Sequence, residues 1–137
     1  AARGNAGVKA LVYVAGLAPD EGENAPDLLG KYPGATLGAH VYEVPLADGT
    51  ADAYVHQNFY HQHFCADLSA EQAALDAATQ RPLNTAAFNE GSGEPAWKTI
   101  PSWFIYPELD LAIPTQTFRF MAERAEARST VEVPGAS

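Results

Sequence analysis

Four side chains that can bind metal ions lie close together in the sequence: His56, His61, His63 and Cys65. On a strand, the last three would share one face, an arrangement that a zinc site could use. On a helix, His56, Tyr60 and His63 would line up instead, and His61 would lie one turn from Cys65. The flanking residues are aromatic and the chain has no second ligand pair with metal spacing, so the pattern favours a segment that packs its aromatic rings. We therefore expect no metal and no other cofactor, and a metal-binding module around His61 and His63 is the weakest alternative.

Cys65 lies two residues from His63, which raises the question of a thiol nucleophile. A reactive thiol needs a pKa lowered by a cation or by a helix N-terminus, and the nearby Asp67 acts in the opposite direction. The pattern favours a small buried side chain with no catalytic role. Because Cys65 is the only cysteine, an internal disulfide and a multi-cysteine zinc site are both excluded.

The elements that would position reactive groups begin with a strand at Val8–Leu17. This segment is almost continuously apolar and rich in valine and tyrosine, and Gly16, Pro19 and Asp20 close it. Its composition favours a strand that is covered on both faces, although a buried helix has a similar pattern. Because such strands belong mostly to parallel sheets flanked by helices, the sequence predicts an α/β fold.

A strand, a helix and a second strand are expected near the C-terminus. Ser102–Tyr106 is a short apolar strand, a helix follows from about Thr115 to Ala127, and Ser129–Val133 is the last strand. The helix carries apolar residues at i, i+3, i+4 and i+7 that predict one buried stripe: Phe118, Met121, Ala122 and Ala125. A strand–helix–strand unit of this length makes its two strands parallel neighbours.

The middle of the chain is expected to mix short elements. His40–Leu46 and Ala51–His56 form a hairpin around the Asp48-Gly49 pair, and Pro45 restricts the first strand to an edge or an end. Ser69 and Gln72 predict a capping box. Three helical segments are expected: one turn at Pro26–Leu29, a helix at Ala70–Thr79 and a short helix at about Leu83–Phe88.

The charge balance excludes several classes of partner. The 137 residues contain 8 Lys and Arg against 17 Asp and Glu, which gives a formal net charge of −9. This charge repels phosphate backbones and anionic lipids, so we expect neither a nucleic-acid partner nor a membrane partner. No apolar run approaches the roughly 20 residues that span a bilayer. The length corresponds to one domain with enough apolar residues for a core.

Four sequence blocks, VKALVYVAGLAPDEGE, IPSWFIYPELDLAIP, FRFMAERA and TVEVPGAS, together resemble the C-terminal half of small serine α/β-hydrolases of the esterase type. The first and last blocks are the specific ones, and Leu37–Thr99 matches only loosely, as the variable cap region. The resemblance implies a single partial α/β-hydrolase domain over residues 1–137. Its core would be 1–18 and 100–137, with parallel strands and flanking helices, and residues of about 19–99 would form a mixed, cap-like insertion.

The resemblance also implies a role for Asp110. In this family the nucleophile is followed in chain order by the acid and then by the histidine. Asp110 comes at the loop after the strand that resembles the seventh of the family, where the triad acid is placed. Such an acid accepts the imidazole Nδ1–H and stabilises the imidazolium. Glu108 is the alternative acid, and an aspartate that only caps the following helix is the structural alternative for Asp110.

Two family features are absent from these 137 residues. The Gly-x-Ser-x-Gly elbow does not occur, and Gly91-Ser92-Gly93 is only a loop tripeptide. The histidine that the family carries directly after Pro-Gly-Ala-Ser would follow Ser137. The sequence therefore predicts a hydrolase fragment that carries the acid but neither the nucleophile nor the base, and the isolated chain is expected to be inactive.

Aromatic residues are concentrated in the cap-like insertion. Phe59, Tyr60, Phe64 and Trp97 are the candidate lining of a substrate pocket for a small apolar ester. The alternative is that these rings only pack the cap.

Three functions compete at this stage. The first is a serine hydrolase that acts on carboxylic esters. The second is a non-catalytic, self-associating remnant or a small apolar ligand-binding module, and the third is the metal module above. Without the elbow-bearing half, the Val8 strand keeps an unpaired edge and the sheet lacks helices on one face. The expected partner is therefore another copy of the chain or the missing N-terminal half.

Overall fold

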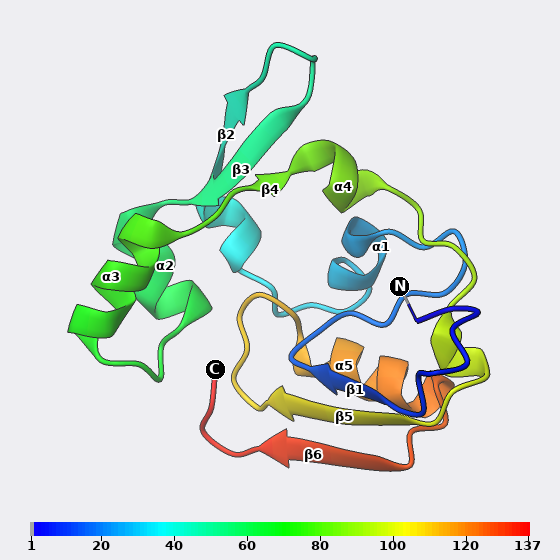
Figure 1. Cartoon of the computed structure of the whole chain (residues 1–137). Coiled ribbons are helices and arrows are strands. Elements are labelled where there is room, and N and C mark those ends of the chain that lie inside the picture. Colours follow the sequence, from blue (N-terminus) through cyan, green and yellow to red (C-terminus); the bar gives the residue numbers. More distant parts are fainter. Residues whose placement is uncertain (1) are drawn as a thin grey trace.

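The computed structural model describes residues 2–137, and its core is a parallel sheet of three strands. The strands are β1 (Leu11–Val14), β5 (Ser102–Pro107) and β6 (Ser129–Val133), in the order β1-β5-β6 (Figure 1). Both pairings are parallel. β1 is shorter than the expected Val8–Leu17. It ends where Ala15 adopts a φ of 44°, directly after its amide donates a last hydrogen bond of 2.9 Å to the carbonyl of Ile105.

The helix α5 (Thr115–Arg124) connects β5 to β6 and covers one face of this sheet (Figure 1). The expected strand–helix–strand crossover is confirmed. The predicted stripe is confirmed too, with Met121 fully buried and Phe118 1% exposed. The helix ends three residues before Ala127 because Glu126 turns into the left-handed region, with a φ of 48°.

The opposite face of the parallel sheet is open. Phe104 and Tyr106 of β5 are buried against α5, but the alternate residues Trp103 and Ile105 are each 36% exposed. Strand register places five apolar side chains on this side, which we call the open face: Val12, Val14, Trp103, Ile105 and Val131. The expectation that β1 is covered on both faces is therefore met on one face only, and within residues 2–137 its outer edge pairs with no strand.

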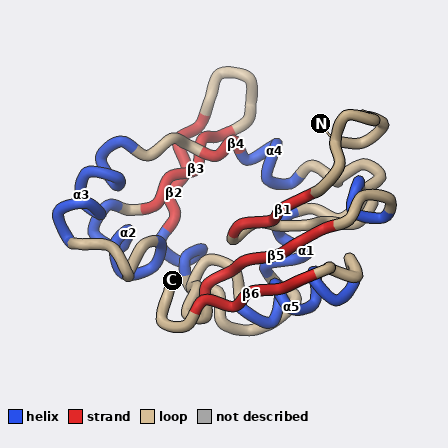
Figure 2. The backbone as a smooth tube through the Cα atoms, turned by 60° about the horizontal axis from the view of Figure 1, so that its bottom comes forward, coloured by secondary structure: helices blue, strands red, loops and turns tan. Residues whose placement is uncertain are grey.

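Residues 19–99 lie between β1 and β5 and contain a second sheet, which is antiparallel and has the order β2-β3-β4 (Figure 2); we call this segment the insertion. Its strands are β2 (Val41–Pro45), β3 (Ala51–Val55) and β4 (Leu83–Asn84). Its α-helices are α1 (Ala25–Leu29), α2 (Gln57–Phe64), α3 (Ala70–Thr79) and α4 (Thr85–Asn89). Two short 3₁₀ helices complete it: η1 (Leu37–His40) and η2 (Ala96–Lys98).

Most local expectations for the insertion are confirmed. The hairpin turns at Gly49, whose φ of 86° suits glycine, and Pro45 is the last residue of an edge strand. Ser69 caps α3 by accepting the amide of Gln72, but the Gln72 side chain donates to Asp76 instead of returning to Ser69. The helix expected at Leu83–Phe88 begins two residues later, because Leu83–Asn84 pairs with β3 as a strand.

The buried residues of the described chain form two hydrophobic clusters. The larger one joins the parallel sheet, α5 and parts of the insertion that include Leu28 and Trp97. The smaller one lies between α2 and α3 around Tyr60, Cys65, Ala73 and Ala77. Among residues 2–137, no helix combines the length and the apolar character that crossing a bilayer requires.

Candidate active site

The loops that leave the carboxyl ends of β5 and β6 lie against each other. The amide of Glu108 donates to the carbonyl of Val133 at 3.1 Å, and the amide of Leu109 donates to the carbonyl of Ala136 at 2.9 Å. Carboxyl ends of parallel strands are where α/β sheets place their sites. These hydrogen bonds therefore keep the loop after β6 close to the loop after β5.

Asp110 lies in the loop after β5 and is half-buried. Its Oδ1 accepts the amides of Ala112 at 2.7 Å and Ile113 at 2.8 Å, so the carboxylate is fixed in one orientation. Its Oδ2 receives no hydrogen bond from residues 2–137 and is available to another donor. Asp110 closes a turn ahead of α5 and does not cap the helix itself, whose N-cap residue is Pro114.

Glu108 is engaged differently. Its Oε2 accepts the amide of Gly135 at 3.0 Å, and its backbone carbonyl accepts the hydroxyl of Thr115 at 2.7 Å. Gly135 has a φ of 70°, so the chain turns sharply at this contact. The Glu108 carboxylate therefore holds the turn after β6 in place.

A cleft of about 600 Å³ opens beside Asp110. One wall comes from the core loops and includes Glu108, Asp110 and Ser137, and the other comes from the insertion and includes Gly34 and Asp67. Among the described residues, Glu108, Asp110 and Asp67 are the only charged ones that line it, so this lining carries negative charge without a cation. Such a surface suits a neutral or cationic group better than an anion.

The insertion reaches this cleft through a few hydrogen bonds. The amides of Thr36 and Leu37 both donate to the carbonyl of Leu111, at 2.8 and 3.1 Å. The amide of Asp67 donates to Ser137 Oγ at 3.2 Å, and the amide of Ser137 donates to Asp67 Oδ2 at 3.5 Å. The shape of the cleft therefore depends on how the insertion sits on the core.

The four aromatic residues expected to line a pocket do not form one group, although Tyr60 and Phe64 pack edge to face with ring centroids 5.0 Å apart. Trp97 is buried in the main core, where its Nε1 donates to the carbonyl of Pro19 at 3.0 Å. Tyr60 is buried between α2 and α3, and its neighbour Phe64 is half exposed. Phe59 stacks on His40 with ring centroids 4.1 Å apart. None of the four lines the cleft beside Asp110, so a shared lining role for them stays a prediction.

The histidine-rich segment is a helix, α2, and its side chains have separate partners. His61 Nε2 lies 2.9 Å from the carbonyl oxygen of Leu68, and His63 Nδ1 lies 2.8 Å from Thr36 Oγ1. In the part of the chain that the structure describes, no three His, Cys, Asp or Glu side chains are grouped as metal ligands. The geometry gives the metal-module hypothesis no support.

Cys65 is buried, and its Sγ lies 3.8 Å from the carbonyl oxygen of Tyr60. Burial, followed by the charges of Asp76 and Asp67, raises the pKa of the thiol. A raised pKa leaves little thiolate at neutral pH, which agrees with a packing role. Burial, followed by the electrostatic effect of His63 and His56, lowers the pKa of His40 on η1, whose ring centroid lies 4.2 Å from that of His63.

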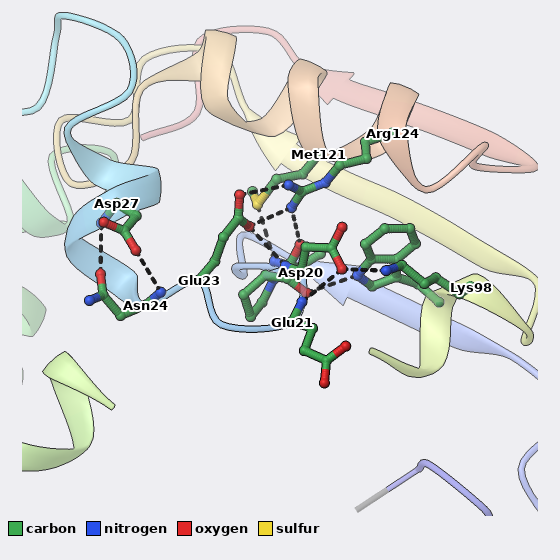
Figure 3. Close-up of polar contacts among 11 residues, drawn as sticks. Asp20, Glu21, Glu23, Asn24, Asp27, Lys98, Met121 and Arg124 are labelled. Carbon is green, nitrogen blue, oxygen red and sulfur yellow. Dashed lines mark hydrogen bonds and ion pairs between the residues drawn. The ribbon is translucent and has the colours of Figure 1, made fainter. Parts of the chain in front are cut away.

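A polar cluster around Arg124 was not expected from the sequence. Arg124, in the last turn of α5, binds Glu23 in the insertion, and Lys98 pairs with Asp20 nearby (Figure 3). Two features of the sequence are compatible with this cluster: Arg124 follows the stripe residue Met121 by three positions, and the segment Asp20–Glu23 is acidic. Nothing in the sequence paired residues that are 101 positions apart.

Comparison with known proteins identifies the fold. No protein-family model matches this chain, and no curated protein matches it. The structure is similar to a crystal structure of polyneuridine aldehyde esterase, with a TM-score of 0.74 and 13% sequence identity over 92% of this chain and 53% of that chain. A histidine-to-alanine mutant of that esterase matches with a TM-score of 0.69 and 12% identity, over 91% of this chain and 53% of that one. The chain thus has an α/β-hydrolase fold and spans about half the length of the solved structures it matches.

Proposed function

We propose that this chain is the acid-bearing half of a serine hydrolase that cleaves small, apolar carboxylic esters. Asp110 would orient the histidine, and the serine and the histidine would come from residues outside these 137. The observation that carries the proposal is the position of Asp110: it follows the central parallel strand, two backbone amides fix its Oδ1, and its Oδ2 is free of donors within the described residues. Likeness to a protein named as an esterase supports the reaction class.

The roles follow from the geometry and from the chemistry of ester cleavage. A residue placed directly after Ser137 would leave the loop that is hydrogen-bonded to the Asp110 loop. A histidine there would donate Nδ1–H to Asp110, and its Nε2 would take the proton of the serine hydroxyl as the oxygen attacks the ester carbonyl. The alcohol leaves with a proton from the imidazolium, and water then hydrolyses the acyl-enzyme. Asp110 stays ionised and stabilises the imidazolium.

Glu108 is the less suitable acid. Its side chain is exposed and one amide, that of Gly135 in the turn after β6, holds one of its oxygens, whereas two amides orient the half-buried Asp110. We assign it the task of holding that turn, and with it the approach of the next residue to Asp110.

The open face supports a partner for the chain. Five apolar side chains on one side of the sheet and the unpaired outer edge of β1 are surfaces that folded proteins cover. The matched esterase structure is about twice as long as the matched region. We propose that the remaining half of the hydrolase, with its strands and helices, covers the edge and the face, and a second copy of this chain is the alternative cover.

The open face also favours a second candidate function, a non-catalytic protein that associates with itself or binds a small apolar ligand. A p-nitrophenyl acetate assay on the isolated chain tests whether the nucleophile lies outside these residues, as both candidates require. For the isolated chain we expect no turnover above buffer, and turnover that a fluorophosphonate inhibits would contradict the placement of the nucleophile outside these residues.

The decisive test uses the longer protein that includes the serine elbow and the histidine. Asp110→Asn is expected to lower kcat by about 10³–10⁴-fold, because an amide cannot hold the imidazole in the required tautomer. Glu108→Gln is the matched control on the same loop and is expected to lower kcat less than about tenfold. A full loss in Glu108→Gln with Asp110→Asn active would exchange the two roles. Full-length protein without ester turnover would leave only the non-catalytic candidate.

A further inference from the structure

The loop after β6 is held from the core side at two of its residues. The amide of Gly135 donates to Glu108 Oε2 at 3.0 Å, and the carbonyl of Ala136 accepts the amide of Leu109 at 2.9 Å. Both partners belong to the loop after β5. The core therefore fixes residues 135 and 136, but neither of these bonds reaches Ser137.

Ser137 is held from the other side of the cleft, by Asp67 of the insertion. The amide of Asp67 donates to Ser137 Oγ at 3.2 Å, and the amide of Ser137 donates to Asp67 Oδ2 at 3.5 Å. Within residues 2–137, these two are the only hydrogen bonds of Ser137, and both residues line the cleft. Because each residue uses its backbone and its side chain, the pair restricts the orientation of Ser137 more than a single contact does.

The turn that carries Asp67 is itself anchored. It connects α2 to α3, and across it the amide of Leu68 donates to the carbonyl of Cys65 at 3.1 Å. His61 Nε2 lies 2.9 Å from the carbonyl oxygen of Leu68, a contact in which the ring nitrogen donates because a carbonyl only accepts. Cys65 is buried in the cluster between α2 and α3. Asp67 therefore reaches Ser137 from a fixed backbone, and His61 helps to fix it.

We infer that Asp67 is a positioning residue for the catalytic base: through Ser137 it orients, from the insertion side, the residue that follows Ser137. This inference rests on the proposed function, which puts the histidine at that position. The core bonds at residues 135 and 136 set where the loop runs, and the pair of Asp67 and Ser137 sets the direction in which the next side chain leaves it. The orientation of a general base affects the chemical step more than it affects substrate binding.

The test in the longer protein compares two substitutions of Asp67. Asp67→Ala removes the acceptor of the Ser137 amide and is expected to lower kcat about tenfold with KM within about twofold, because one net hydrogen bond is lost and substrate contacts stay. Asp67→Asn keeps an oxygen that accepts this amide and is expected to retain kcat within about twofold. Asp76→Ala is the matched control with unchanged kcat, since Asp76 is a carboxylate of α3 that binds Gln72 and does not line the cleft.

Amide hydrogen exchange on the 137-residue chain tests the contact without any activity. The Asp67 amide is expected to exchange at least about threefold faster in Ser137→Ala, which removes its acceptor, than in the wild type. The Leu68 amide is the internal control, because it donates to the carbonyl of Cys65 in the same turn. We expect its rate to stay within about twofold of wild type.

Four results would each overturn the inference. These are Asp67→Ala with the kcat of the wild type, a loss in Asp67→Ala that lies in KM, a loss in Asp67→Asn or Asp76→Ala as large as in Asp67→Ala, and an Asp67 amide that exchanges equally in Ser137→Ala. Asp110→Asn distinguishes this failure from failure of the proposed function. If Asp110→Asn keeps its turnover, or the longer protein has none, the proposed function fails and the positioning role fails with it. An inactive Asp110→Asn beside a fully active Asp67→Ala removes only the role of Asp67.

Discussion

The two faces of the parallel sheet differ in what covers them, although both are apolar. On the α5 side, Phe104 and Tyr106 are 3% exposed each, and Tyr106 stacks on Phe118 with ring centroids 4.9 Å apart. On the open face, the alternate residues Trp103 and Ile105 of the same strand are 36% exposed. Strands that are apolar on both faces are typical of sheets covered on both sides. The sequence of β5 thus encodes more burial than these 137 residues provide.

The largest expected effect is on the α5 side. Phe118→Ala is expected to lower the free energy of unfolding by about 3–5 kcal/mol, because it removes a buried ring and leaves a cavity. Ile105→Ala, on the open face, is expected to cost about 1 kcal/mol, since much of that side chain already contacts solvent. Urea unfolding followed by circular dichroism measures both. Equal losses would mean that the open face is covered in the purified chain.

Elements with local signals could be predicted from the sequence. The stripe of α5 was readable because Phe118, Met121 and Ala122 recur at helical spacing, and the hairpin because glycine at position 49 suits the positive φ of its turn. The parallel order of β5 and β6 followed from the helix between them. In each case residues that are close together in the sequence are sufficient to predict the element.

Features that depend on distant contacts could not be predicted. Trp97 was expected in a pocket of the insertion, but it packs in the main core because its indole reaches the carbonyl of Pro19, 78 positions away. The Arg124–Glu23 pair joins residues from separate elements in the same way. The segment around His61 fitted a strand or a helix, and only its packing on α3 distinguishes them. A catalytic role for Asp110 remains a proposal, although its loop lies where the sequence placed it.

A charge on the open face sharpens the comparison. Ile105→Lys is expected to weaken association of the chain, with itself or with the remaining half, by about a hundredfold, because an unpaired ammonium at a closed apolar interface costs several kcal/mol. Sedimentation equilibrium at several concentrations measures this change. Leu75→Lys is the matched control, since Leu75 is an exposed apolar residue on α3, away from the sheet. A wild-type chain that stays monomeric at high concentration and binds no other half would show that the open face needs no cover.

The smallest expected effect is the loss of folding stability at low pH, and we expect it to involve the α5 side of the sheet and not the open face. Among the described residues, strand register places no ionisable side chain of β1, β5 or β6 on the open face, whereas residues 18–24, which pack beside α5, contain two paired carboxylates, Glu23 and Asp20. The hydrogen bond from Arg124 lowers the pKa of Glu23 in spite of partial burial, and the hydrogen bond from Lys98 lowers the pKa of Asp20. A carboxylate whose pKa is lowered by folding stabilises the folded state above its ordinary pKa. That stability is lost as the pH falls through the lowered value.

The free energy of unfolding should therefore fall below about pH 4.5, where free carboxylates begin to protonate, while association through the open face stays constant until the chain unfolds. Glu23→Gln is expected to cost about 1–2 kcal/mol at pH 7, between the values for exposed ion pairs and for buried charged hydrogen bonds, and to flatten the acid slope. Urea unfolding between pH 7 and pH 3 measures both quantities. An unchanged slope in Glu23→Gln would mean that the pair with Arg124 contributes no pH-dependent stability. Association that weakens in parallel with the free energy of unfolding would mean that charged groups contribute to the interface. The contrast between an apolar open face and an ionic α5 side would then be wrong.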